Sequence, residues 1–344
     1  MKLVKTTEAV GQVLCHDITQ IIPGVKKDAV FRKGHIITEE DIPVLLSVGK
    51  DMIYIWENDE TMLHENDAAE ILYRMTAGEN MHPSEVKEGK IEVIADSDGL
   101  LKVDRERLKK VNSFGELMIA ARHGNTAVKK GDKLAGTRII PLVIKKEKME
   151  KASEICSDAP ILKILPFTMK KAAVITTGNE VFYGRIKDGF TPVIEKKINE
   201  FGVEMAFHET FNDDDKKITK GCLDAVNAGI DIIFCTGGMS VDPDDKTPLA
   251  IKNTGADIIS YGSPVLPGAM FLLSYYKKDD RIIPICGLPG CAMYNKRTIL
   301  DLVLPRLLAN DMITSDELAS LGEGGFCLNC DVCTFPNCGF GKGW

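Results

Sequence analysis

The chain has 344 residues, a length that is typical of two or three domains and sufficient for a sizeable core. Its 44% hydrophobic and 27% charged residues exclude a chain that is disordered throughout. It has no apolar run near the roughly 20 residues of a membrane helix and no signal-peptide pattern, so we expect a cytoplasmic protein without a membrane partner. The 43 basic and 50 acidic residues give a net charge of −7, which argues against a nucleic-acid partner but allows a small anionic ligand.

The first half of the sequence predicts two small parts. Residues 1–56 combine short apolar runs, glycine turns and one helix predicted over 38–48, which indicates an α+β lead-in. Residues 57–165 carry a polar helix predicted over 67–75, and a charged segment, 145–151, that we interpret as a bridge. Short β-type runs at 90–94, 99–103 and 129–144 make this part a predicted β-rich module.

Residues 166–310 alternate predicted strands and helices, and a cysteine-rich tail, 311–344, follows them. Such alternation is typical of parallel strands joined by crossover helices. The predicted fold class is therefore α/β, a three-layer domain with a mostly parallel sheet preceded by a smaller α+β and β-rich region. The predicted strands are 172–177, 203–207, 230–235 and 281–286, and the predicted helices are 191–202, 214–228, 248–253 and one ending at 308.

Small and hydroxyl residues follow three of these strands. In parallel sheets ligands lie beyond the carboxyl ends of the strands, where glycines let the backbone approach a ligand and helix starts receive phosphate. Each segment alone is more often a tight turn, but their convergence on one sheet edge favours a phosphate site. The candidate binding residues are Thr177, Gly178, Gly237, Gly238, Ser240, Pro289 and Gly290.

Carboxylates stand beside these segments. They cannot bind phosphate directly, so we expect them to hold Mg²⁺ or to orient water against it. A single aspartate after a strand is more often a helix cap than a ligand, which is the competing interpretation for each of them. The candidate catalytic residues are Glu180, Asp213, Asp214 and Asp245, the last within an acidic run at 242–245.

The ordered set of segments resembles the molybdopterin-binding domain of molybdenum cofactor biosynthesis proteins. The matching segments are 176–181, 184–186, 212–215, 237–238, 245–248, 267–268 and 288–290. Residues 1–56 are similar, more loosely, to the opening of the molybdopterin molybdenumtransferases. That resemblance implies insertion of molybdate into adenylylated molybdopterin with release of AMP, with Mg²⁺ and commonly as a homodimer. It assigns the acidic roles to Glu180, to Asp213 or Asp214 and to Asp245, and the pterin-phosphate cradle to Gly237, Gly238 and Ser240.

The sequence also departs from the transferase pattern. The middle part lacks the segment Thr-Gly-Ala followed by Pro-x-Gly-Ala-Asp, which in the transferases gives an acidic residue to the facing subunit's site. Asp242 stands where glycine is usual, Cys291-Ala292 replaces Asn-Pro, and we expect no C-terminal β-barrel domain. Two alternatives therefore stay open: a non-catalytic protein that delivers molybdopterin to a molybdoenzyme partner, and a nucleotide hydrolase similar to competence-damage proteins.

The tail carries Cys327, Cys330, Cys333 and Cys338 in the spacing C-x₂-C-x₂-C-x₄-C. Four thiolates so close in sequence suit a metal, and the spacing differs by one residue from the C-x₂-C-x₂-C-x₃-C-P run of bacterial ferredoxins. An iron–sulfur cluster is the first interpretation, Zn²⁺ the second, and sulfur chemistry without a stable metal the third. The other six cysteines are predicted to be buried as small hydrophobes.

Overall fold

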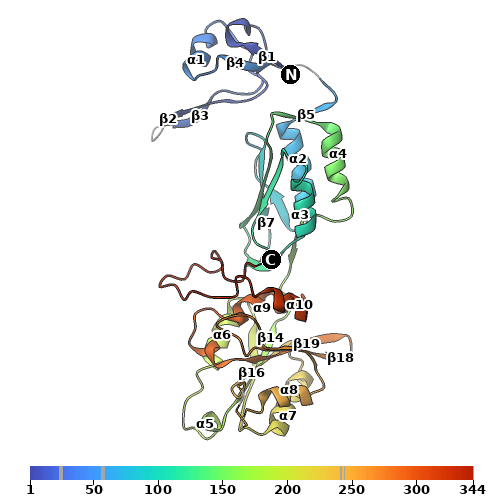
Figure 1. Ribbon diagram of the computed structural model, residues 1–344, viewed down its shortest axis with the longest axis vertical. Coiled ribbons are helices and arrows are strands. Elements are labelled where there is room, and N and C mark those ends of the chain that lie inside the picture. The colour runs from blue at the N-terminus through green and yellow to red at the C-terminus, as the bar shows by residue number, and fades with distance from the viewer. Residues whose placement is uncertain (23–25, 56–58, 241, 244, 344) are drawn as a thin grey trace. The chain divides into compact units, whose positions relative to one another are not determined.

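The computed structural model describes residues 1–22, 26–55, 59–240, 242–243 and 245–343. The chain forms two compact units (Figure 1). The first unit contains residues 1–96, 103–122 and 130–163, and the second contains residues 97–102, 123–129 and the chain from Ile164 onward. The predicted boundary between residues 56 and 57 lies outside the described residues.

The N-terminal segment of the first unit is a small α+β arrangement. Strand β1 (Lys2–Lys5) pairs antiparallel with β4 (Met52–Ile55), and β2 (Ile18–Ile22) pairs with β3 (Lys26–Phe31). Helix α1 (Asp41–Ser47) begins later than predicted, because the Asp41 carboxylate accepts the backbone N–H of Thr38 at 2.8 Å and holds residues 38–41 in a turn. A core of Ala9, Leu14, Ile18, Ile37, Leu45 and Ile53 joins these elements.

The rest of the first unit contains more helix than the sequence predicts. A four-stranded antiparallel sheet runs in the order β6-β7-β11-β9, and three helices accompany it. The prediction that the charged segment 145–151 is a bridge is wrong. This segment lies mostly within helix α4 (Lys146–Glu154), whose Met149 and Ala152 are buried on one face. The remaining elements are β5 (Met62–His64), α2 (Glu65–Thr76), β6 (Met81–Pro83), β7 (Lys90–Ala95), α3 (Arg105–Asn112), β9 (Leu117–Ala121), β11 (Lys133–Ile139) and β12 (Val143–Lys145).

Two sheets occupy the remaining chain. Strands β10 (Thr126–Val128), β8 (Gly99–Val103) and β13 (Leu162–Leu165) form a three-stranded sheet in that order. The larger sheet has six strands in the order β15-β14-β16-β19-β18-β17. Neighbours from β15 to β19 are parallel, whereas β18 is antiparallel to both β19 and β17. Its strands are β14 (Lys171–Thr177), β15 (Glu204–Phe211), β16 (Ile232–Thr236), β17 (Asp257–Tyr261), β18 (Leu272–Lys278) and β19 (Arg281–Leu288).

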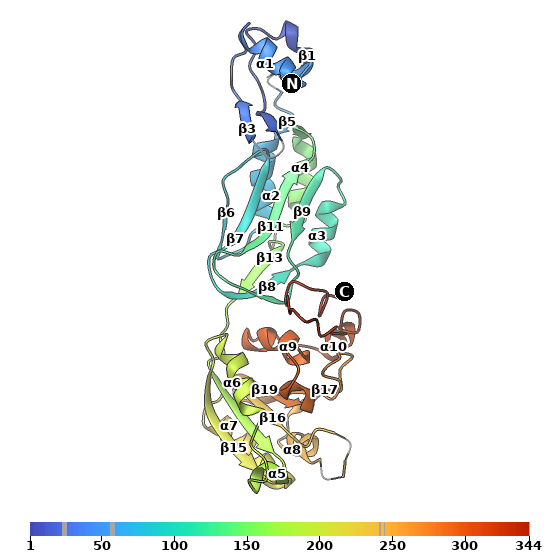
Figure 2. The same ribbon diagram turned by 90° about the vertical axis from the view of Figure 1, so that its left-hand side faces the viewer.

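Helices cover both faces of the six-stranded sheet, so the predicted three-layer α/β class is confirmed. Along β14, Ala172 and Val174 face a core with helices α6 and α9, while Ala173 and Ile175 face a core with α7 and α8. Figure 2 shows the strands of this sheet between the two sets of helices. The helices are α5 (Asn179–Phe182), α6 (Thr191–Asn199), α7 (Asp215–Asn227), α8 (Thr247–Asn253), α9 (Ile299–Leu308) and α10 (Ser315–Ser320).

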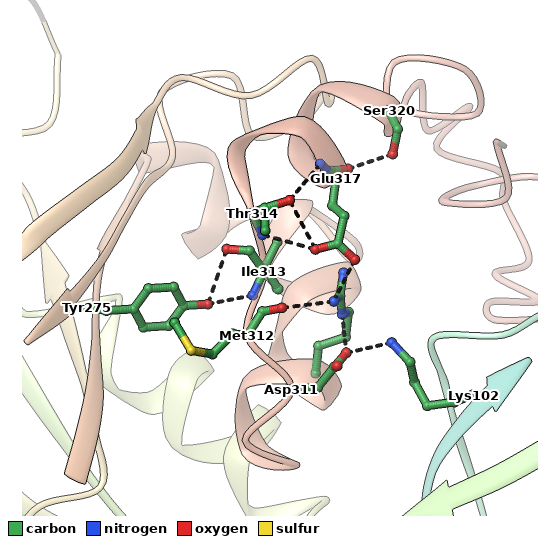
Figure 3. A network of polar contacts seen from close by, with 9 residues as sticks. Lys102, Tyr275, Asp311, Met312, Ile313, Thr314, Glu317 and Ser320 are labelled. Carbon is green, nitrogen blue, oxygen red and sulfur yellow. Dashed lines mark hydrogen bonds and ion pairs between the residues drawn. The ribbon is translucent and has the colours of Figure 1, made fainter. Parts of the chain in front are cut away.

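A buried cation fixes the chain between α9 and α10. The Arg306 side chain is 8% exposed and forms ion pairs with Asp311 and Glu317. Lys102 adds a second cation to Asp311 at 2.8 Å, and Thr314 caps α10 by exchanging hydrogen bonds with Glu317 (Figure 3). The first part of the tail, residues 311–317, is therefore held by a network of charged hydrogen bonds.

None of the helices among the described residues has the length and apolar character that a membrane crossing requires.

Candidate functional site

A cavity of about 920 Å³ opens at the carboxyl edge of the six-stranded sheet. Its walls come from the segments that follow β16 and β19, from the turn that precedes β18 and from the start of the tail. The predicted residues Gly237, Gly238, Ser240, Asp245, Pro289 and Gly290 all line this cavity, so the structure brings them together. Val241 and Asp244, which belong to the same predicted loop, lie outside the described residues.

The Gly237-Gly238 turn requires glycine for two reasons. Both residues have positive φ, +81° and +52°, a conformation that other residues rarely adopt. A Cβ on Gly237 would also stand 2.1 Å from the carbonyl oxygen of Thr177, at the end of the neighbouring strand β14. The turn is therefore pressed against β14, which leaves its other side bare toward the cavity.

Thr177 and Gly178 support this turn. Neither residue is among the described residues that line the cavity. The Thr177 hydroxyl lies 2.9 Å from the hydroxyl of Thr247, the first residue of α8, and both side chains are buried. Gly178, with φ +132°, donates its N–H to the carbonyl oxygen of Phe211 at 3.2 Å. These contacts join the ends of β14 and β15 to the start of α8.

Asp245 organises the loop that follows β16. Its Oδ2 accepts the backbone N–H of Ser240 at 2.7 Å, across the turn of the loop. The Tyr261 hydroxyl donates to the Met239 carbonyl oxygen at 3.0 Å and ties this loop to β17. Burial of Tyr261, and then the negative charge of Asp245, raise the pKa of its phenol above the ordinary value, so Tyr261 is a neutral donor at physiological pH.

The other three predicted carboxylates follow strands β14 and β15. Asp213 Oδ2 accepts the backbone N–H of Asn179 at 3.0 Å, which joins the end of β15 to the start of α5. Asp214 is the N-cap of α7 and accepts the N–H groups of Lys216 and Lys217. Glu180 is exposed on α5. None of the three is among the described residues that line the cavity, and Asp214 has the capping role that is common for such a residue.

The charged groups that line the cavity are carboxylates. In the part of the chain that the structure describes, no three His, Cys, Asp or Glu side chains surround one ion position. Mg²⁺ is usually held by one or two carboxylates plus substrate phosphates and water, and Asp242 and Asp245 line the cavity as such a pair. The described lining contains no Lys or Arg, so a phosphate entering beside these carboxylates would need a cation.

The structure adds residues that the sequence analysis did not propose. Tyr294 and Asn295, just beyond Pro289-Gly290, line the cavity, and Tyr294 is 74% exposed. Cys291 also lines it and is only half-buried, so the prediction of a core cysteine is wrong there, as it is for half-buried Cys156. Tyr294, an aromatic residue shortly after the Leu-Pro-Gly segment, is the feature of the sequence that could have indicated a surface for binding a ring.

A second missed cluster lies at the end of β14. Thr176 donates its hydroxyl to Asp188 at 2.9 Å, and His208 Nε2 lies 3.2 Å from the hydroxyl oxygens of both Thr176 and Thr191. Burial of Asp188 opposes its ionisation, but hydrogen bonds from Thr191 and Thr176 outweigh burial and hold its pKa below the ordinary value. His208 is thus a member of a polar network at the end of β14.

The four tail cysteines line one small cavity of about 120 Å³, and all four are free thiols. Cys327 also lines the large cavity.

Comparison with known proteins finds a family that the six-stranded sheet domain resembles. Residues 173–309 match a family described as a "probable molybdopterin binding domain". The six-stranded sheet domain is similar to the domains of that family. The match runs from β14 through α9, includes every predicted binding and catalytic residue, and ends before the cysteine tail.

Residues 3–57 match a second family, described only as a domain of unknown function. The looser resemblance of this segment to the opening of the transferases stays a prediction.

Curated relatives match a limited part of the chain. A Bacillus cereus protein named "putative competence-damage inducible protein" is 24% identical over 110 residues, which are 32% of this chain and 26% of that protein. A CinA-like protein of Syntrophus aciditrophicus is 33% identical over 81 residues, 24% of this chain and 19% of that protein. The chain thus spans about a quarter or less of the length of these relatives.

Solved structures match less than half of the chain at low identity. The tungsten cofactor synthesizing protein MoaB of Pyrococcus furiosus is 18% identical, with a TM-score of 0.35, covering 42% of this chain and 98% of that one. The CinA protein of Thermoplasma acidophilum is 18% identical, with a TM-score of 0.34, covering 40% of this chain and 98% of that one.

Proposed function

We propose that the cavity beside Gly237 and Gly238 binds a pterin phosphate of the molybdopterin type. The observation that carries this proposal is the bare glycine turn, pressed against Thr177, that lines a cavity in a domain similar to those of the molybdopterin-binding family. Its volume, about 920 Å³, lies within the range of ~300–1,000 Å³ that is common for small-molecule sites. Met239, Pro289 and Tyr294 supply an apolar and aromatic wall for a ring, and the glycine turn and Ser240 supply the polar end.

The charge of the cavity supports a cation-assisted phosphate site. Asp242 and Asp245 would repel phosphate oxygens, and Mg²⁺ held by them would neutralise that repulsion and polarise a phosphoanhydride. Asp245 in addition shapes the loop through the Ser240 N–H. On this basis we assign Asp245 as the Mg²⁺ ligand, and assign Asp213 and Asp214 to the support of the sheet edge.

The finer activity that we propose is insertion of molybdate into adenylylated molybdopterin with release of AMP. The alternative is binding without turnover, for delivery to a molybdoenzyme. The second candidate is the nucleotide hydrolysis that the resemblance to competence-damage proteins implies, with a nucleotide as the phosphate ligand. The relatives named as a putative competence-damage inducible protein and a CinA-like protein are the reason for keeping this candidate. All three candidate functions use the glycine turn as the phosphate contact. Variants of this turn therefore test the site separately from the choice of ligand.

Fluorescence titration with molybdopterin, with AMP as the competing nucleotide probe, tests the binding site. We expect Ser240→Asp and Gly238→Asp to weaken binding by more than about tenfold, or ~1.4 kcal/mol, because each adds a negative charge at the phosphate end. The matched control is Ser315→Asp, at the exposed first residue of α10, where an acidic residue is well tolerated. Unchanged affinity in a folded Ser240→Asp variant would contradict the site, and preference for AMP would favour the nucleotide candidate.

An AMP-release assay with adenylylated molybdopterin, molybdate and Mg²⁺ tests turnover. We expect Asp245→Asn to retain the ligand but to lose AMP release and the dependence of binding on Mg²⁺. The control is Asp257→Asn, which removes an equally charged side chain from an exposed ion pair with Lys277. Wild-type protein that binds the ligand and releases no AMP would leave the delivery role as the function.

A further inference from the structure

Within the tail, residues 324–341 form a closed loop that is anchored to the domain at both ends. At its start, the Leu266 N–H donates to the Gly325 carbonyl oxygen and the Cys327 N–H donates to the Leu266 carbonyl oxygen, both at 2.8 Å. At its end, Phe340 is 5% exposed within the core of the sheet domain. The Gly341 N–H then closes the loop by donating to the carbonyl oxygen of Gly324 at 2.9 Å. The fold therefore holds both ends of the segment that presents the thiols.

This loop surrounds one cavity with all four of its cysteines. The cavity has a volume of about 120 Å³, and Phe326, Phe335 and Phe340 contribute aromatic walls to it. Cys327 and Cys338 pack against the domain core, while Cys330 and Cys333 are exposed on the outer side. Four free thiols thus line a single cavity.

The size of the cavity discriminates between the candidate occupants. A tetrahedral zinc site has Zn–S bonds of about 2.3 Å, so its sulfur atoms lie only ~3.8 Å apart and leave no cavity between them. The space that the four tail cysteines line is several times the ~30 Å³ that one water molecule occupies in the liquid. A cavity of this volume has room for an occupant of several atoms.

The charge of the walls suits an anionic occupant. A cubane [4Fe–4S] cluster with four thiolate ligands carries a net negative charge, and nearby charges and hydrogen bonds set its reduction potential. Lys296 and Arg297 line the cavity, and the Arg297 guanidinium lies 4.8 Å from the centre of the Phe335 ring. Lys296 also donates to the Asp331 carbonyl oxygen at 3.1 Å, which ties the middle of the loop to the chain before α9.

We propose that Cys327, Cys330, Cys333 and Cys338 bind one [4Fe–4S] cluster at the wall of the large cavity. Residues 326–329 line both cavities, so the same stretch of backbone contacts a cluster on one side and a ligand on the other. Cys327 lines both cavities, so this cluster-binding residue also borders the large cavity. The adjacency to a pterin rests on the proposed function, whereas the cluster itself rests only on the tail.

Iron, zinc and acid-labile sulfide analysis of the full-length protein tests the cluster. Protein purified without oxygen and reconstituted with iron, sulfide and a thiol should hold about four iron and four sulfide per chain. We expect Cys330→Ser to lose most of the iron and the electron paramagnetic resonance signal of the reduced cluster. Cys156→Ser, which changes a half-buried cysteine in the other unit, should retain both. One zinc per chain without sulfide, or reconstituted protein that retains no iron, would overturn the proposal.

A second measurement tests the adjacency separately. Molybdopterin added to the reduced, cluster-loaded wild type should change the resonance spectrum, because the ligand contacts the backbone of residues 326–329. The Ser240→Asp variant should assemble the same cluster and show no such change. A cluster that forms with full stoichiometry but does not respond to bound molybdopterin would overturn the adjacency and leave the cluster in place.

Discussion

Gly237 and Thr177 lie in contact across two parallel strands, so close that a Cβ on Gly237 would stand 2.1 Å from the Thr177 carbonyl oxygen. The contact fixes how the turn after β16 meets the end of β14. Any side chain at position 237 has to move one of the two strand ends, and the turn that lines the cavity moves with it. The pair therefore connects the stability of the sheet edge to the shape of the binding site.

We expect Gly237→Ala to lower the free energy of unfolding by more than Gly229→Ala does. Both glycines have φ +81°, so both variants carry the same backbone strain, about 1 kcal/mol. A Cβ on Gly229 meets nothing within 4 Å, whereas on Gly237 it clashes with Thr177. Urea denaturation should show an additional loss of roughly 2 kcal/mol at position 237. Equal losses would show that the contact is not as close as described.

Replacement of Thr177 and of Thr236 by valine should change the free energy of unfolding in opposite directions. Thr177→Val leaves the buried Thr247 hydroxyl without this partner and should cost about 1 kcal/mol. Thr236 is fully buried, and its hydroxyl has no hydrogen-bond partner among the residues that the structure describes. Thr236→Val should therefore be neutral or stabilise the fold by roughly 1 kcal/mol. Thermal unfolding of both variants checks the difference in sign, and a destabilised Thr236→Val would indicate a partner for that hydroxyl.

The pKa of Asp311 predicts a loss of stability in acid. Burial opposes ionisation of this carboxyl, but hydrogen bonds from Arg306 and Lys102 outweigh burial and hold its pKa below the ordinary 3.8. The stabilisation is fully present above the ordinary value and is lost as the pH falls through the lower pKa of the folded state. We expect Asp311→Asn to cost about 2 kcal/mol at neutral pH and to weaken the dependence of stability on pH below about 4.

Urea denaturation at a series of pH values from 7 downward provides the measurement for Asp311. Asp224→Asn is the control, because Asp224 forms an exposed pair with Lys220 one helical turn away, and such pairs contribute about 0.3–0.5 kcal/mol. If Asp311→Asn and wild type lose stability in parallel as the pH falls, the carboxyl is not the group that titrates.

Much of the six-stranded sheet could be predicted from the sequence. The four parallel strands were found because each is a short run of apolar residues between helix signals, and Thr191-Pro192 marks a helix start well. The two antiparallel strands β17 and β18 were missed. Residues 257–261 form an edge strand with no buried residue, so its apolar pattern is weak. Helix α4 was missed because its buried face is only Met149 and Ala152 within a run of charges.

The parts of the site that depend on backbone conformation could be predicted from the sequence. The parts that depend on which side chains face the cavity were harder to predict. Glycines at 237 and 238 are informative because few other roles require two adjacent glycines at the end of a buried strand. Carboxylates are ambiguous, because Asp213, Asp214 and Asp245 all follow strands and all accept backbone N–H groups. Only the three-dimensional arrangement distinguishes Asp245, which lines the cavity, from the other two. The approach of the tail to this cavity has no signal in local sequence.

Native mass spectrometry of the intact protein mixed with molybdopterin tests the central claim most directly, that the cavity beside Gly237 and Gly238 holds this ligand. The account predicts one bound molybdopterin per chain in the wild type and in Cys330→Ser, and none in Ser240→Asp under the same conditions. Wild-type protein that takes up no molybdopterin, or a folded Ser240→Asp variant that binds it as the wild type does, would contradict the account.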